Sequence, residues 1–166
     1  MIFFTLGTQL PFDRMTKAVD DWCAARGRAD LFGQISDPGR DGYRPLHYKW
    51  VGHMDPAAFD ETFEAAEFVV AHAGMGSILT ALGLGKPIVV MPRLAKFDEH
   101  RNDHQRATVE RLAGRPGLMI AMDETELPGV LDEAAAIAAA GGAGGEAVPP
   151  FAEDRLIAAL RQEIMK

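Results

Sequence analysis

The sequence predicts a Rossmann-like α/β domain, in which helices cover both faces of a parallel sheet. Short apolar runs alternate with longer amphipathic stretches along the chain. Each run is apolar on both of its faces, which is typical of buried parallel strands. Strands that alternate with helices imply right-handed crossovers within a single sheet. With 166 residues, of which 48% are hydrophobic, the chain is expected to form one ordinary domain with its own core.

Five short apolar runs are predicted to be strands, and a weaker strand is predicted at His47–Val51. The five are Ile2–Leu6, Leu31–Ile35, Phe68–Ala71, Pro87–Met91 and Leu118–Met122. The amphipathic stretches between them are predicted to be helices over Asp13–Ala25, Pro56–Ala66, Gly76–Leu84, His100–Ala113 and Pro128–Ala139. The stretch Ser36–Arg44 contains two Gly and one Pro and is expected to be a surface loop.

The chain divides into a globular part, residues 1–137, and a tail. Residues 138–150 are low in complexity and rich in Gly and Ala, so they are predicted to be a flexible linker. Residues 151–166 are predicted to form an amphipathic helix, whose apolar stripe contains Phe151, Leu156, Leu160 and Ile164. Two interpretations of this helix stay open: it folds back on its own domain, or it docks on another chain.

The charge balance and the single cysteine argue against several classes of protein. Acidic residues number 24 against 17 Lys and Arg, and the formal charge of −7 argues against a nucleic-acid binder. Cys23 alone forms neither a disulfide framework nor a four-cysteine zinc site. No apolar run approaches the roughly 18 residues of a membrane span, and the first residues are typical of a strand rather than a signal peptide. We therefore expect a soluble cytoplasmic protein.

Three turns after predicted strands are the candidate ligand site. In an open parallel sheet, ligands bind outside the carboxyl ends of the strands, near the point where the strand order reverses. The first turn contains Gly7 and Thr8, and the second is His72–Ser77. The third begins with Pro92-Arg93 and continues into the polar run Lys96–Gln105.

The His72–Ser77 turn has the strongest physical argument for binding an anion. A helix N-terminus presents unpaired N–H groups and the positive end of the helix dipole to a phosphate. Gly74 and Gly76 carry no Cβ that would hold a phosphate away, and Ser77 adds a hydroxyl donor. The alternative is an ordinary tight turn, in which glycine supplies backbone freedom and Ser77 caps the helix.

The two common nucleotide motifs are absent. A dinucleotide fingerprint would need glycine at the position of Leu79. A P-loop would need four residues between the two glycines that precede its lysine, but here only one residue separates the glycines before Lys86, and Pro87 follows directly. Lys86 is therefore interpreted as a solvated turn residue. A generic NAD or ATP site is disfavoured, and no cofactor is expected.

The polar run Lys96–Gln105 raises the question of a metal. His100 and His104 are four residues apart on one face of a predicted helix. A zinc-protease arrangement is absent, because Arg101 follows His100, and no third ligand is evident. We expect no metal here. The His, Asn, Glu and Gln side chains instead suit a ligand rich in hydroxyl groups.

Four segments together resemble a known family. They are Thr5–Thr8 followed by Pro11–Arg14, Val69–Ser77, Gly85–Arg93, and Glu99-His100 followed by Asp103–Gln105. In this order they resemble the C-terminal domain of glycosyltransferase family 28 over about residues 1–130. The resemblance is strongest to short, stand-alone members. These are the PssE/EpsE-like subunits of exopolysaccharide synthesis and the catalytic subunit of the dolichol-linked UDP-GlcNAc transferase, with the peptidoglycan transferase MurG more distant.

The resemblance implies the donor-binding, C-terminal half of a GT-B enzyme, whose acceptor is bound by another domain. It implies that the amides of Gly74–Ser77 hold the diphosphate of a UDP-sugar, and that the Trp50–Met54 segment cradles uracil. His104 and Gln105 match a pair that binds donor-sugar hydroxyls, with Glu99 assisting. The implied UDP-sugar contacts are Gly7, Thr8, Met54, His72, Ala73, Gly74, Met75, Gly76, Ser77, Thr80, Pro92, Arg93, Glu99, His104 and Gln105.

One position departs from the family pattern. Many relatives have an acidic residue three positions after the Ser or Thr, where it holds the ribose hydroxyls, but this chain has Thr80. A hydroxyl gives up the charge-assisted hydrogen bond. The resemblance therefore leaves donor affinity and nucleotide preference open at this position.

The resemblance also implies a partner. Such transferases invert the anomeric centre, which needs a general base on the acceptor hydroxyl, and the sequence offers no convincing base. We expect a membrane-anchored, acceptor-binding subunit to supply it, together with a lipid-linked sugar acceptor. This chain would then lie at the inner face of the membrane through its partner. The alternatives are a non-catalytic nucleotide-sugar-binding regulatory subunit on the same fold, or an epimerase acting on a UDP-sugar.

Overall fold

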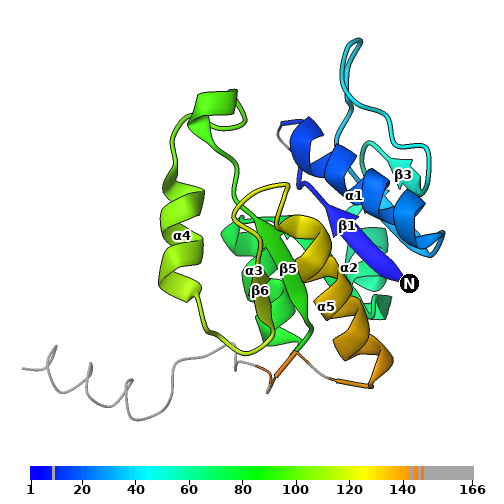
Figure 1. Ribbon diagram of the computed structural model, residues 1–166, viewed down its shortest axis with the longest axis vertical. Helices are drawn as coiled ribbons and strands as arrows, with labels where there is room; N and C mark the ends of the chain where they lie inside the picture. The colour runs from blue at the N-terminus through cyan, green and yellow to red at the C-terminus, as the bar shows by residue number, and fades with distance from the viewer. Residues whose placement is uncertain (9, 143, 146, 148–166) are drawn as a thin grey trace, which may run out of the picture.

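Six parallel strands form one sheet in the order β3-β2-β1-β4-β5-β6 (Figure 1). The structure, a computed structural model, describes residues 1–8, 10–142, 144–145 and 147. The strands are β1 Ile2–Thr5, β2 Leu31–Gln34, β3 Lys49–Val51, β4 Phe68–His72, β5 Ile88–Met91 and β6 Leu118–Ile120. The predicted Rossmann-like sheet is therefore confirmed, and the weak strand predicted at His47–Val51 is its edge strand β3.

Helices cover both faces of this sheet. Helices α1 (Asp13–Arg26) and α5 (Leu127–Ala139) lie on one face, and α2 (Pro56–Ala65), α3 (Met75–Gly83) and α4 (His104–Leu112) pack on the other. Neighbouring strand residues point to opposite faces: Phe4 belongs to the core under α1 and α5, and Phe3 to the core under α2 and α3. This burial on both sides explains why the strands read as unbroken apolar runs.

Local sequence signals fix where the helices begin and end. The Asp55 carboxylate caps α2 by accepting from the Ala58 N–H at 3.0 Å, and Pro56 occupies the first helical position. Gly27 ends α1 in the left-handed conformation, with a φ of 60°. Lys86 also has a structural role, because its Nζ donates to the Glu64 carbonyl at 2.9 Å and to the Ala66 carbonyl. The interpretation of Lys86 as a solvated turn residue is therefore wrong.

The segment between β5 and α4 differs from the predicted helix His100–Ala113. It forms a short 3₁₀ turn, Ala95–Phe97, followed by Asp98 in the left-handed conformation, and α4 begins only at His104. The physical reason is a set of carboxylate contacts. Glu99 accepts from the Leu94 N–H and Asp103 accepts from the Ala95 N–H, which folds the segment back on itself.

The tail lies mostly outside the described residues. Helix α5 runs to Ala139, and the Gly144 N–H donates to the Gly85 carbonyl at 2.9 Å. The predicted C-terminal helix over 151–166 falls among residues that the structure does not describe. Within the described part of the chain, no helix is long and apolar enough to cross a membrane.

Candidate ligand-binding site

A cavity of about 390 Å³ opens at the carboxyl ends of β1, β4 and β5. Strands β1 and β4 are neighbours in the sheet but far apart in the sequence, so the cavity lies where the strand order reverses. All three predicted turns reach it. Its lining residues are Leu6, Gly7, Thr8, Leu10, His72, Gly74, Gly76, Ser77, Arg93, His100, His104 and Gln105.

One wall of the cavity is the N-terminus of α3. Gly74 occupies the N-cap position, so the helix has no side-chain cap, and Ser77 does not cap it. The N–H groups of Met75, Gly76 and Ser77 lie in the first turn, where a helix offers them no internal acceptor. A Cβ at Gly76 would meet nothing within 4 Å. This wall therefore suits an anion, because the amides and the positive end of the dipole face open space.

His72 sits between the two glycine-containing turns. A Cβ at Gly7 would lie 3.1 Å from its Cε1, and a Cβ at Gly74 would lie 2.4 Å from its Nε2. Gly7 also has a φ of +70°, a conformation that favours glycine. Glycine is therefore favoured at both positions, because a side chain there would crowd the imidazole of His72.

Burial keeps His72 uncharged at neutral pH. Burial, reinforced by the nearby positive charge of Arg93, lowers the pKa of His72 to about 4. Its Nδ1 is buried and has no hydrogen-bond partner among the described residues. The cavity therefore presents a neutral imidazole beside the helix N-terminus.

Gln34 joins the Gly7 turn to the Met54 segment. Its Nε2 donates to the Gly7 carbonyl at 3.3 Å, and its Oε1 accepts from the Met54 N–H at 2.9 Å. The side chain is 2% exposed. Met54 itself does not line the 390 Å³ cavity, so its predicted contact with uracil stays a prediction.

Arg93 is buried in the cavity wall and its guanidinium is already engaged. It donates to the carbonyls of Pro11 (2.8 Å) and Leu10 (2.5 Å), with longer contacts to those of Leu6 and Glu99. Burial lowers the pKa of Arg93 to about 10, although the Glu99 charge opposes this shift. Arg93 therefore holds the β1–α1 turn in place, whatever it contributes to a ligand.

Another wall of the cavity is the start of α4. The Gln105 side chain is 5% exposed, and its Oε1 accepts from the Arg93 N–H at 3.1 Å. His104 is exposed and contacts Asn102 through its Nδ1. His100 lies before the helix, and its ring packs edge-on against that of His104 at a centroid distance of 4.4 Å. The predicted spacing of the two histidines on one helix face is therefore wrong, but their rings still meet.

The remaining predicted contacts lie around the cavity rather than in its lining. Ala73 is buried in the core, Met75 is exposed at the start of α3, and Pro92 accepts from Arg14. Thr80 lies further along α3, in a separate cavity of about 260 Å³ beside α2. The structure does not bring Glu99 into the 390 Å³ cavity, because its carboxylate is bound by Arg14.

Sequence reasoning missed three lining residues and one residue behind them. Leu6, Leu10 and His100 line the cavity, and Gln34 positions two of its neighbouring turns. The sequence predicts no ligand contact for His100, although His100 belongs to one of the segments that carry the family resemblance. Its Nδ1 is buried with no hydrogen-bond partner among the described residues. A polar Gln at the carboxyl end of the apolar β2 run is the one signal that could have pointed to Gln34.

The fold and the cavity define a Rossmann-type α/β domain with an anion-suited ligand site at its topological switch point. Residues 43–139, more than half of the chain, match the model of the glycosyltransferase family 28 C-terminal domain. The chain therefore belongs to this family. A search of curated protein sequences found no match.

Solved structures show the same fold. A glycotransferase of kitacinnamycin is 22% identical with a TM-score of 0.59, over 83% of this chain and 36% of that one. The C-terminal CMP-Kdo binding domain of WaaA from Acinetobacter baumannii is 12% identical with a TM-score of 0.53, over 100% and 90%. ALG13 is 18% identical with a TM-score of 0.51, over 96% and 93%. The chain spans about a third of the first of these, and its fold is that of a GT-B C-terminal domain.

Proposed function

We propose that this chain is the donor-binding, catalytic subunit of an inverting glycosyltransferase. It moves a hexosyl group from a UDP-sugar to a lipid-linked acceptor in exopolysaccharide or glycolipid synthesis, with a membrane-anchored partner that binds the acceptor. The observation that carries this proposal is a single cavity with two chemically different walls. The α3 wall suits a diphosphate, and the α4 wall, with His104 and Gln105, suits sugar hydroxyls.

The chemistry that this cavity would support is charge stabilisation. When the glycosidic bond to the donor breaks, negative charge grows on the β-phosphate of the leaving UDP. The N–H groups of Met75, Gly76 and Ser77 are held by the helix before the reaction starts, so they would stabilise that charge without reorganisation. A neutral His72 beside these amides could donate a further hydrogen bond to the phosphate without carrying a positive charge. The base that activates the acceptor is assigned to the partner.

Gly76→Asp tests the diphosphate assignment. An aspartate in the first turn of a helix is locally favourable, so the variant should fold, but its carboxylate would repel the diphosphate. We expect UDP binding, measured by calorimetry, to be abolished. Gly129→Asp is the matched control, because Gly129 also lies in the first turn of a helix and a Cβ there also meets nothing within 4 Å.

The same titrations decide between nucleotides. UDP is expected to bind more tightly than CMP or ADP at equal concentration. Unchanged UDP affinity in Gly76→Asp would refute the phosphate site. Absence of binding of UDP and of UDP-sugars to the wild-type chain at millimolar concentration would refute the proposed function as a whole.

A further inference from the structure

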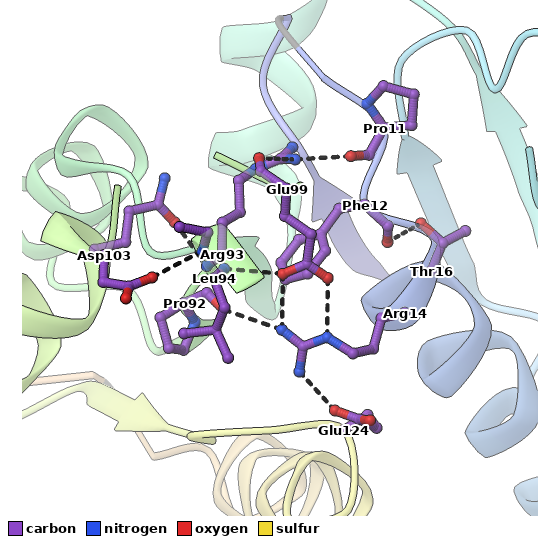
Figure 2. A network of polar contacts seen from close by, with 12 residues as sticks. Pro11, Phe12, Arg14, Thr16, Pro92, Arg93, Leu94, Glu99, Asp103 and Glu124 are labelled. Atoms are coloured by element: carbon purple, nitrogen blue, oxygen red, sulfur yellow. Dashed lines mark hydrogen bonds and ion pairs between the residues drawn. The ribbon is translucent and has the colours of Figure 1, made fainter. Parts of the chain in front are cut away.

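An ion pair outside the cavity ties together three turns at the carboxyl edge of the sheet (Figure 2). Arg14 lies at the start of α1. Its Nε and Nη2 each donate to a Glu99 oxygen at 2.9 Å, and its Nη1 donates to Glu124 at 2.5 Å. Glu99 lies between β5 and α4, and Glu124 lies between β6 and α5. One guanidinium therefore joins the turns that follow β1, β5 and β6.

The pair is shielded from water and has the geometry of a strong contact. The Arg14 and Glu99 side chains are 12% and 9% exposed. The contact is bidentate, which fixes orientation as well as distance. The Arg14 guanidinium also lies 4.9 Å from the centroid of the Phe97 ring. Screening by solvent is therefore weak, and the pair holds one arrangement.

Glu99 transmits this anchoring to the α4 wall of the cavity. Its Oε2 also accepts from the Leu94 N–H at 2.9 Å, so one carboxylate fixes both ends of the turn before His100. His100 follows Glu99 directly and packs against His104. Gln105 is bound to the Arg93 N–H at the other end of the same segment. The position of the α4 wall thus depends on where Arg14 holds Glu99.

We infer that Arg14 and Glu99 are positioning residues for the donor sugar. They act through His100, His104 and Gln105, and neither needs to touch the ligand. This inference rests on the proposed function, in which the α4 wall binds the sugar and the α3 wall binds the diphosphate. It follows that loosening the pair weakens the binding of the sugar part of the donor and leaves the binding of UDP nearly intact.

The test compares affinity for UDP-sugars with affinity for UDP. Wild-type chain is titrated by calorimetry with UDP, UDP-glucose, UDP-glucuronate and UDP-N-acetylglucosamine, and the tightest sugar nucleotide is kept. Arg14→Lys keeps the positive charge but cannot form the bidentate contact of a guanidinium. Glu99→Gln keeps the shape of the side chain but removes its negative charge. In both variants we expect the ratio of UDP-sugar to UDP affinity to fall on the order of tenfold. The double variant should fall no further, because both changes break the same contact.

A second bidentate pair on α1 provides the matched control. Arg26, at the other end of the helix, donates to Asp132 on α5 at 3.0 and 2.6 Å. Arg26→Lys and Asp132→Asn remove a contact of the same bidentate geometry, although a more exposed one, at the other end of α1. These control variants are expected to lower the melting temperature without changing the ratio of UDP-sugar to UDP affinity. If the Arg14–Glu99 pair were only structural, its variants would give this same result.

Each outcome has one meaning. An unchanged ratio in both Arg14→Lys and Glu99→Gln overturns the positioning role while the proposed function stands. If the affinity ratio falls in Glu99→Gln but not in Arg14→Lys, Glu99 contacts the sugar directly, and the positioning role is also overturned. A wild-type chain that binds neither UDP nor any UDP-sugar overturns the proposed function, and the positioning role with it.

Discussion

The imidazole of His72 leaves no room for a side chain at Gly74. The φ of Gly74 is −86°, which any residue adopts, so the constraint is steric and not conformational. In Gly74→Ala the new Cβ would lie 2.4 Å from His72 Nε2 and would push the ring into the cavity. We expect a loss of about 1–3 kcal/mol in the free energy of unfolding. UDP binding should be lost with it, and thermal unfolding and calorimetry measure the two effects.

Two further variants isolate the role of the ring. In Gly74→Ala/His72→Ala the clash is removed, so the stability lost in the single variant should return. Gly83→Ala, at the other end of the same helix, should be at least as stable as wild type, because a Cβ there meets nothing within 4 Å. A normal melting temperature for Gly74→Ala would contradict the steric explanation.

The buried imidazole also predicts how stability depends on pH. Burial, reinforced by Arg93, lowers the pKa of His72 to about 4, whereas an unfolded histidine titrates near 6.5. Between pH 6.5 and 4 the unfolded chain binds a proton that the folded chain does not. Stability should therefore fall with decreasing pH across this window, by at most about 1.4 kcal/mol per pH unit, and not depend on His72 above it.

Urea titrations of His72→Asn measure this dependence. The variant should lose stability less steeply than wild type between pH 6.5 and 4. His53→Asn, which changes an exposed histidine, should follow the wild-type curve. Identical slopes in His72→Asn and wild type would show that the imidazole is charged in the folded protein.

The residues that the sequence placed correctly are those at strand ends. In a parallel sheet the carboxyl ends of all strands meet at one edge, so Gly7, His72 and Arg93 could be brought together from their positions alone. What their side chains do there was not predictable. Arg93 binds carbonyls more than 80 positions away in the chain, and Glu99 is held by Arg14, at a separation of 85 residues. Such contacts leave no periodic pattern in the sequence.

At the scale of elements, strand prediction succeeded and one helix start failed. The five apolar runs predicted five of the six strands, because burial on both faces of the central strands favours apolar residues in them. The edge strand β3 gave only a weak signal, since Lys49 is exposed and Trp50 and Val51 are half-buried. The segment before α4 carries a helical pattern of charges, yet Glu99 and Asp103 bind backbone N–H groups there instead of continuing the helix. The 3₁₀ turn and the left-handed Asp98 follow from those contacts. A sequence pattern cannot distinguish a carboxylate in solvent from one that binds a turn.

At the scale of the whole molecule, a net charge of −7 is compatible with a site for a diphosphate. Such an anion would be bound by backbone amides and a helix dipole, which add no formal charge to the sequence. Arg93, which lines the cavity, is bound to carbonyls of the protein, and Arg14, whose ion pair lies outside it, is bound to carboxylates. A basic surface is therefore not needed for the proposed ligand, and overall composition gives no guide to it.

The proposed division of labour between two subunits leads to the last prediction. In this proposal the described cavity binds the donor, and the base and the acceptor site belong to a membrane-anchored partner. We expect the purified chain to bind UDP-sugar and to transfer little sugar to a lipid-linked acceptor in detergent or vesicles. Adding the co-expressed acceptor-binding subunit should raise transfer well above the sum of the two separate rates. Gly76→Asp in the same complex should abolish that gain, which excludes a contribution from the partner alone.

Three results would decide against this scheme in different ways. Robust transfer by the isolated chain would show that the base and the acceptor site lie on this chain. UDP-sugar binding without transfer, even in the reconstituted pair, would instead favour a regulatory nucleotide-sugar subunit. Formation of an epimer of the donor sugar would assign the pair to a different reaction. The proposed donor cavity is compatible with all three outcomes, because fold alone does not fix the reaction.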